Sequence, residues 1–125
     1  MKAPGISAAA VLAAFTCLAA DAASAQDCSD PQTQIEMNEC AHLDYLAADE
    51  MLNAEYKRAR AALGESGATA LRDAQRAWIV FRDKACEVEG AQFAGGSIRP
   101  MVVAGCLARL TRRRTEDLRL LSQTY

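Results

Sequence analysis

Hydrophobic residues recur every three or four positions over three stretches of this chain, and polar residues fill the positions between them. This spacing is that of amphipathic helices, and no segment alternates at period two over enough residues to indicate a sheet. We expect one long helix, or two nearly collinear ones, over residues 33–63, another over about 68–89 and a last one from residue 97 onward. The pattern predicts an all-α fold, a small bundle of three to four helices.

The predicted helix ends carry recognisable signals. Thr33 and Glu36 match a capping box, in which each side chain serves a free backbone amide of the other residue. Gly64 is a natural C-terminal stop, and residues 65–67 are typical of a short polar turn. Ser97, after a glycine-rich break, is expected to cap the last helix. Short turns make neighbouring helices antiparallel.

The second helix is organised around Trp78, the only tryptophan of the chain. Leu71, Gln75, Trp78 and Arg82 recur at spacings of three and four and therefore share one face. This face is mostly apolar, but a core built on it must supply hydrogen-bond partners for the amide of Gln75 and the guanidinium of Arg82.

Polar residues also interrupt the apolar faces of the other two helices. Asp49, one turn before Asn53, falls near the stripe of the first helix, and Arg114 lies on that of the last. The rest of the last stripe is apolar: Val103, Leu107, Leu110, Leu118 and Leu121. A buried charge without a partner is costly, so we expect Asp49 to pair with Arg82 or Arg114 in a structural network that includes Gln75.

The first 25 residues have the features of a signal peptide. Lys2 supplies a positive start, residues 6–20 are apolar and rich in alanine, and residues 23–25 give a small-x-small cleavage pattern. Cleavage near Ala25 would leave a helical domain of residues 26–125 in the periplasm or outside the cell. The apolar run is short for a membrane span. Phe15 and Thr16 fit a lipoprotein signal poorly, so we do not expect lipidation of Cys17.

Removal of this leader takes away one of five cysteines and leaves Cys28, Cys40, Cys86 and Cys106. An even number in a small exported chain indicates a disulfide framework, with three possible connectivities. Pairing Cys28 with Cys40 and Cys86 with Cys106 is favoured because each bridge then straddles one short connection. A zinc site is the competing interpretation, but there is no Cys-x-x-Cys pair and His42 is the only histidine.

The net charge and the sequence motifs argue against several classes of function. A net charge of −2 gives no reason to expect nucleic acid or an anionic membrane as a partner. Arginines gather on the last helix and acidic residues between Asp27 and Glu55, which is typical of oppositely charged helices that lie together. No phosphate loop, metal-ligand spacing or nucleotide fingerprint is present, and nothing pairs His42 with a nucleophile. We therefore expect neither an enzyme nor a cofactor.

Several short motifs occur in order along the chain after the leader. They are Cys28, residues 33–41 (Thr-Gln-Ile-Glu-Met-Asn-Glu-Cys-Ala), Tyr45, Ala48-Asp49, Leu52-Asn53, Tyr56, residues 75–79 (Gln-Arg-Ala-Trp-Ile), Phe81-Arg82-Asp83, Cys86, Gly95-Gly96-Ser97, Cys106-Leu107 and Arg114. Together they resemble the LprI-type lysozyme-inhibitor family. The resemblance implies a small helical, disulfide-bonded domain exported by bacteria, and inhibition of lysozyme by the family's namesake lipoprotein.

The first functional hypothesis is a binding protein that blocks lysozyme or a related muramidase. Residues 87–100 are the candidate binding loop, tipped by Gly95, Gly96, Ser97 and Arg99. A disulfide at the base of this loop would lower the entropic cost of binding. It stays open that these glycines only reverse the chain and that Ser97 only caps a helix. The alternative hypothesis is a structural or envelope-stress protein that binds another envelope partner.

Overall fold

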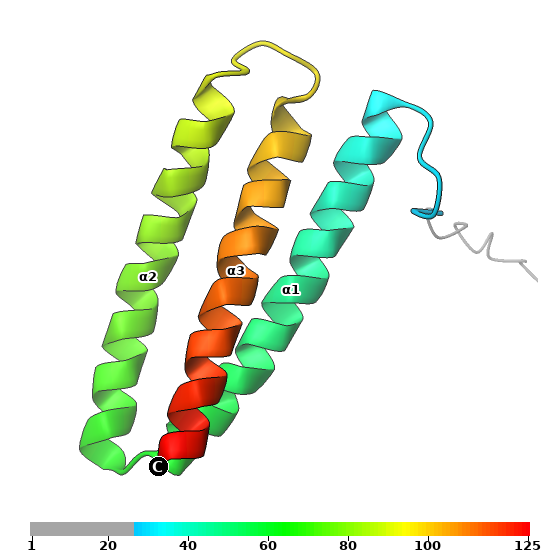
Figure 1. The fold of residues 1–125 in the computed structure, drawn as a ribbon. Coiled ribbons are helices and arrows are strands. Elements are labelled where there is room, and N and C mark those ends of the chain that lie inside the picture. The colour runs from blue at the N-terminus through cyan, green and yellow to red at the C-terminus, as the bar shows by residue number, and fades with distance from the viewer. Residues whose placement is uncertain (1–26) are drawn as a thin grey trace, which may run out of the picture.

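The computed structural model describes residues 27–125, which form three helices: the first and third run parallel to each other, and the second runs antiparallel to both (Figure 1). Helix α1 spans Gln34–Ala62, α2 spans Glu65–Ala91 and α3 spans Arg99–Thr124. The predicted all-α bundle is confirmed, with three helices rather than four. The expected signal peptide lies outside the described residues. Within residues 27–125, no helix combines the length and the hydrophobicity needed to cross a membrane.

The predicted start of α1 is confirmed in detail. The Thr33 side chain accepts from the Glu36 amide at 3.2 Å, and the Glu36 carboxylate accepts from the Thr33 amide at 2.9 Å. These two bonds satisfy amides that have no partner inside the helix. The Thr33 amide, followed by the Gln32 amide, which also donates to this carboxylate, lowers the pKa of Glu36.

The other helix ends differ from the prediction. Residues 65–67 are not a turn but the start of α2, so that only Leu63 and Gly64 connect α1 to α2. The N-cap of α3 is Ile98, without a side-chain hydrogen bond, and the predicted capping role of Ser97 is therefore wrong. The Ser97 carbonyl instead accepts from Asn38 Nδ2 of α1, which holds this part of the chain in the loop.

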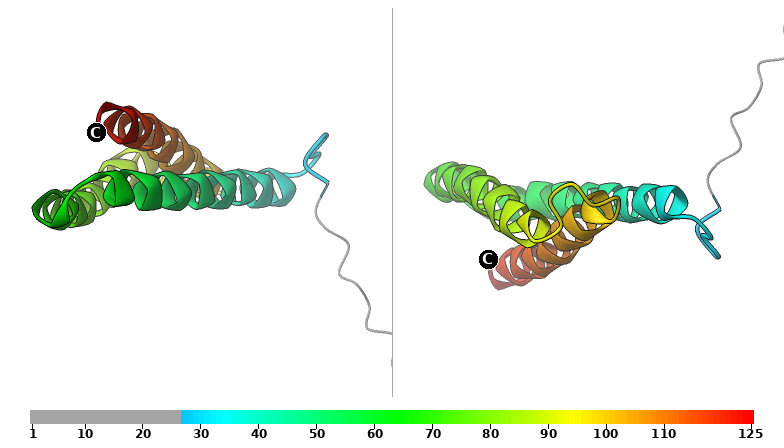
Figure 2. Two further views of the ribbon diagram at one scale, coloured as in Figure 1. Left: turned by 90° about the horizontal axis from the view of Figure 1, so that it is seen from below. Right: turned by 90° about the horizontal axis from the view of Figure 1, so that it is seen from above.

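Helix α3 packs against both of the other helices. It contacts α1 along most of its length and α2 less, whereas α1 and α2 contact each other very little. Figure 1 shows α3 drawn between them, and the end views of Figure 2 show that the three helices are not coplanar. The first and last helices of the chain therefore make the main interface.

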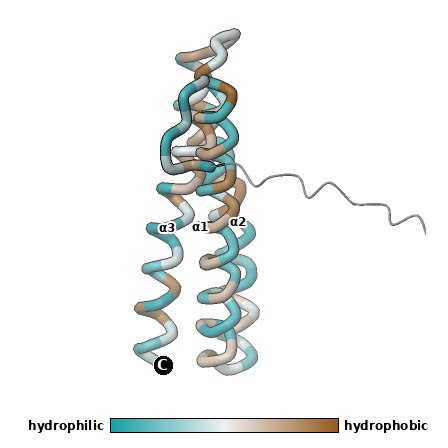
Figure 3. The backbone as a smooth tube through the Cα atoms, turned by 90° about the vertical axis from the view of Figure 1, so that its right-hand side faces the viewer, coloured by the Kyte–Doolittle hydropathy of each residue, from teal (hydrophilic) through white to brown (hydrophobic). Residues whose placement is uncertain are grey.

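The core is small and is centred on Leu52, Ala59, Leu71 and Leu118. Trp78 packs against this cluster and is half-buried, as its place on the stripe predicts. Along α3 the buried positions are mostly small: Ala104, Cys106, Ala108, Thr111, Thr115 and Leu118. Figure 3 shows hydrophobic and hydrophilic positions interleaved along the helices.

The predicted apolar stripe of α3 is correct at Leu118 but is displaced elsewhere. Val103, Leu107 and Leu110 are half-buried and flank the row of small residues. The physical reason is that α3 packs against two helices. The row of residues in the middle of its buried face therefore faces both α1 and α2. Small side chains in that row let the backbones approach closely, and the larger ones fill the spaces on either side.

Helices α2 and α3 come closest near the end that carries their connecting loop. A Cβ on Gly90 would lie 2.5 Å from Val103 Cγ2, so that glycine is required there by close approach and not by a turn. One turn away, Cys86 is bonded to Cys106, and both are almost fully buried. The second bridge joins Cys28 to Cys40. These are the pairings that the spacing favoured.

Candidate functional site

Arg82 is buried at the centre of a polar cluster that joins all three helices. Its side chain is only 7% exposed. Its Nη1 lies 3.5 Å from Asp49 Oδ1 of α1 and 3.4 Å from Thr111 Oγ1 of α3. Its Nε donates to Asp83 Oδ1 at 2.9 Å, and Asn53 donates to the second oxygen of Asp49 at 3.1 Å. Nη2 lies 2.9 Å from Asp83 Oδ1, so each of the three guanidinium nitrogens has a polar partner.

Two aromatic rings complete the surroundings of Arg82. The guanidinium carbon lies 5.4 Å from the ring centroid of Tyr45 and 5.2 Å from that of Trp78. Both distances are those of cation–π contacts, which become stronger when water is excluded. Trp78 therefore contributes to the hydrophobic core and to the site of this buried cation.

A second polar pair links α2 to α3. Arg114 Nε donates to Gln75 Oε1 at 3.0 Å. Of the four residues expected in one network, the structure brings together Asp49 with Arg82, and Gln75 with Arg114, as two separate pairs. Thr111 is an additional member that sequence reasoning missed. Its only signal was a threonine inside a helix, where a hydroxyl needs a partner if it is buried.

Burial raises the pKa of the Tyr45 phenol above its ordinary value of 10.0. The nearby positive charge of Arg82 opposes this rise, and the carboxylates of Asp49 and Asp83 add to it. Tyr45 therefore stays protonated through neutral and mildly alkaline pH, as a hydroxyl that can donate a hydrogen bond.

We expect Tyr45→Phe to reduce the loss of stability at alkaline pH. The folded chain holds this phenol proton more tightly than the unfolded chain. Its contribution is therefore fully present below about pH 10 and is lost as the pH rises through the higher folded pKa. Urea denaturation at pH 9 and 11 should show that the wild type loses more of its free energy of unfolding over this range than Tyr45→Phe does. Tyr125→Phe, at an exposed position, is the control. An equal loss of the free energy of unfolding in the wild type and in Tyr45→Phe across this range would contradict the prediction.

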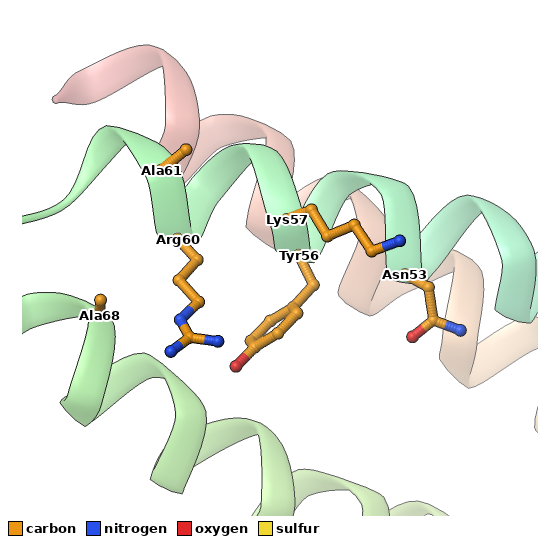
Figure 4. A pocket seen from close by; sticks show the side chains of 6 residues that line it. All are labelled: Asn53, Tyr56, Lys57, Arg60, Ala61 and Ala68. Atoms are coloured by element: carbon orange, nitrogen blue, oxygen red, sulfur yellow. The ribbon is translucent and has the colours of Figure 1, made fainter.

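A cleft of about 510 Å³ lies between α1 and α2, next to the Arg82 cluster. It continues into a neighbouring space of about 710 Å³ toward the α1–α2 connection, and the two share Asn53, Tyr56 and Arg60. Figure 4 shows the side chains of Tyr56 and Arg60 pointing from α1 toward α2. The cleft exists because α1 and α2 both pack on α3 and hardly touch each other. Sequence reasoning did not find this site.

The candidate binding loop is shorter than predicted. Residues 87–91 belong to α2, and Arg99 and Pro100 to the first turn of α3, so that the loop comprises residues 92–98. The reason is that Gly90 packs inside the bundle and does not end the helix. Gly95 has a φ of +77°, a conformation that favours glycine, and Gly96 and Ser97 are exposed beside it.

The loop is fixed at its base from two sides. The Cys86–Cys106 disulfide joins the helices that lead into and out of it, and Asn38 Nδ2 of α1 donates to the Ser97 carbonyl at 2.9 Å. A hollow of about 340 Å³ lies beneath, and Asn38, His42, Arg99 and Pro100 are among its lining residues. Arg99 is therefore beside the loop rather than at its tip.

The described residues define a class of protein: a small, disulfide-bonded, three-helix domain with an open basic cleft and an exposed, fixed loop. Among residues 27–125, no group of three or more His, Cys, Asp or Glu side chains is arranged to hold a metal ion.

Comparison with known proteins identifies the family. The chain belongs to the lysozyme inhibitor LprI family, whose model matches residues 24–118. The resemblance stated from the sequence motifs is thereby confirmed. The chain is also similar to an uncharacterized protein of Rhizobium meliloti (strain 1021), with 42% identity over 133 aligned positions that cover 94% of this chain and 96% of the relative. No solved structure matches the chain significantly.

Proposed function

We propose that this chain is an exported binding protein that inhibits a lysozyme or a related muramidase. Membership of the lysozyme inhibitor LprI family supports the kind of target. Two disulfides support export, because such bonds persist in oxidising compartments. The signal-peptide features of residues 1–25 agree with this proposal and favour a periplasmic or secreted protein.

The observation that carries the proposal is the exposed and fixed loop of residues 92–98. A loop that is already ordered loses little conformational entropy when it enters an enzyme cleft. The Cys86–Cys106 bridge and the bond from Asn38 provide this order before any partner is present. We infer that the loop is the part that enters the muramidase.

The chemistry beside the loop suits such a target. Muramidases act with two carboxyl groups that flank the scissile bond. Arg99 is exposed in the first turn of α3, and neither its guanidinium nor the Ser97 hydroxyl has a hydrogen-bond partner among residues 27–125. A guanidinium can bind a carboxylate through two parallel hydrogen bonds. Arg99 and Ser97 are therefore the residues that we expect to contact the catalytic cleft.

The test is a titration of several lysozymes with the oxidised protein, with cell-wall lysis as the readout. We expect inhibition, and we expect the double variant Ser97→Ala with Arg99→Ala to weaken it at least about tenfold. Arg113→Ala, an exposed arginine about 21 Å along α3 from Arg99, is the matched control and should inhibit like the wild type. Thermal unfolding of each variant checks the fold. If the double variant inhibited as strongly as the wild type, the loop would not be the part that contacts the enzyme. If the folded wild type inhibited no lysozyme, the proposed function would be wrong.

A second candidate function is supported by one surface of α2. Val80, Phe81 and Val88 are more than half exposed, and the first two lie about three helical turns before the loop. Exposed hydrophobic side chains that gather on one helix are typical of protein contact sites. A structural or envelope-stress role, with another envelope protein bound at this surface, would leave lysozymes unaffected and would be impaired by Phe81→Ser.

A further inference from the structure

The cleft between α1 and α2 carries the opposite charge to the chain as a whole. The chain has a net charge of −2, yet the charged residues that line the cleft and the space into which it continues are four arginines, one lysine and one carboxylate: Arg60, Arg72, Arg76, Arg82, Lys57 and Asp49. The carboxylate is already engaged by Arg82 and Asn53. Arg72 and Arg82 also pair with Asp73 and Asp83, so the positive charge that the described residues leave uncompensated is that of Arg60, Arg76 and Lys57.

Two of these arginines are free to bind a ligand. Among residues 27–125, Arg60 and Arg76 have no ion-pair or hydrogen-bond partner, and both are exposed. Arg72 pairs with its neighbour Asp73 at 2.8 Å, but both side chains are about half exposed, and such pairs are weak. Guanidinium groups match carboxylates in geometry as well as in charge.

We propose that this cleft binds an extended acidic segment of a partner polypeptide. Arg72 and Arg76 are one helical turn apart, which places their backbones about 6 Å from each other along α2. In an extended peptide, alternate side chains point the same way and are about 6.6 Å apart. An acidic residue at every second position would thus meet successive arginines of α2, while Arg60 approaches from α1.

The length and walls of the cleft agree with this occupant. Along α1 its lining extends from Tyr45 to Ala61, a helical rise of about 24 Å. Seven extended residues span about 23 Å. The half-buried rings of Tyr45 and Tyr56 supply apolar wall, and the side-chain oxygen of Asn53 can accept from a peptide amide. The available cations come from both walls, Arg60 from α1 and Arg72 and Arg76 from α2, which favours a chain of separated carboxylates over one compact anion.

The cleft and the loop are different surfaces. The loop of residues 92–98 lies at the end of the bundle where α1 begins, and the cleft extends from the middle of α1 toward the α1–α2 connection (Figure 1). Binding of a peptide in the cleft therefore does not depend on inhibition of a lysozyme by the loop.

Fluorescence anisotropy with the oxidised protein tests the proposal. The probe is a labelled heptapeptide, Glu-Ser-Glu-Ser-Glu-Ser-Glu, at low ionic strength. We expect saturable binding that weakens at least about tenfold in the double variant Arg60→Gln with Arg76→Gln. Both residues are exposed and unpaired, so the thermal stability should not change. Arg113→Gln removes one exposed arginine of α3 and should bind the probe like the wild type.

Two further measurements separate the alternatives. A permuted peptide of equal charge, with four consecutive Glu before three Ser, should bind at least about threefold more weakly. Tripolyphosphate is the compact anion, and tighter binding of it than of the heptapeptide would overturn the proposal. So would absence of heptapeptide binding, or equal binding by wild type and double variant. Lysozyme inhibition by the double variant is expected to be unchanged, which keeps a failure here distinct from a failure at the loop.

Discussion

Replacing Cys86 and Cys106 together by alanine is expected to lower the free energy of unfolding by about 3 kcal/mol. The bridge closes a loop of 20 residues and joins α2 to α3 at the point where Gly90 lets them approach most closely. Both cysteines are almost fully buried. Without the bridge, the unfolded chain gains freedom, and the loop of residues 92–98 loses the constraint at its base. Urea denaturation of the oxidised proteins measures the loss.

The Cys28–Cys40 bridge provides the matched comparison. It closes 12 residues and ties the segment before α1 back to the first turns of that helix. The amides of Gln32 and Thr33 donate to Glu36, within the same segment, so this region can come apart without opening the core. We expect its double alanine variant to lose only about 1 kcal/mol. Equal losses for the two pairs would contradict the structural difference described here.

Arg82→Ala is expected to lower the free energy of unfolding by about 3 kcal/mol. The guanidinium has polar partners on three helices and lies against two aromatic rings. Its loss leaves the Thr111 hydroxyl buried without its partner and removes the packing of Tyr45 and Trp78 against a cation. Arg82→Lys keeps the charge but not the planar group, so we expect an intermediate loss.

Arg76→Ala is the control for Arg82, because it removes an arginine from the same helix that is exposed and unpaired. This substitution should change the free energy of unfolding by no more than about 0.5 kcal/mol. Thermal or urea unfolding distinguishes the variants. A loss below about 1 kcal/mol in Arg82→Ala would mean that the cost of burying the guanidinium offsets its contacts.

Features that depend on neighbouring residues could be predicted from the sequence. The capping box of Thr33 and Glu36 is local and marks the start of α1 correctly. The disulfide pairs follow from short separations along the chain. By contrast, the prediction ends the second helix at residue 89, before Gly90, because the reason for a glycine there, the approach of Val103, lies in a different helix. Local reasoning also placed the start of α2 too late.

Features that depend on the rotation and order of the helices could be predicted only in part. Asp49 was expected to pair with an arginine. Whether this partner is Arg82 or Arg114 depends on which face of α3 lies against α1. The cleft arginines gave no signal, because exposed arginines are common on helices. Arg60 and Arg76 become notable only once α3 is seen to hold α1 and α2 apart.

The main interface joins the first helix of the chain to the last, and this has a consequence for the newly synthesised protein. A chain that ends before residue 99 holds α1 and α2, which contact each other very little, and lacks Leu118 of the core. Such a chain cannot bury enough surface to fold. We therefore expect the chain to stay unfolded until its final helix has been made, which is the state that the proposed export through a secretion channel would require.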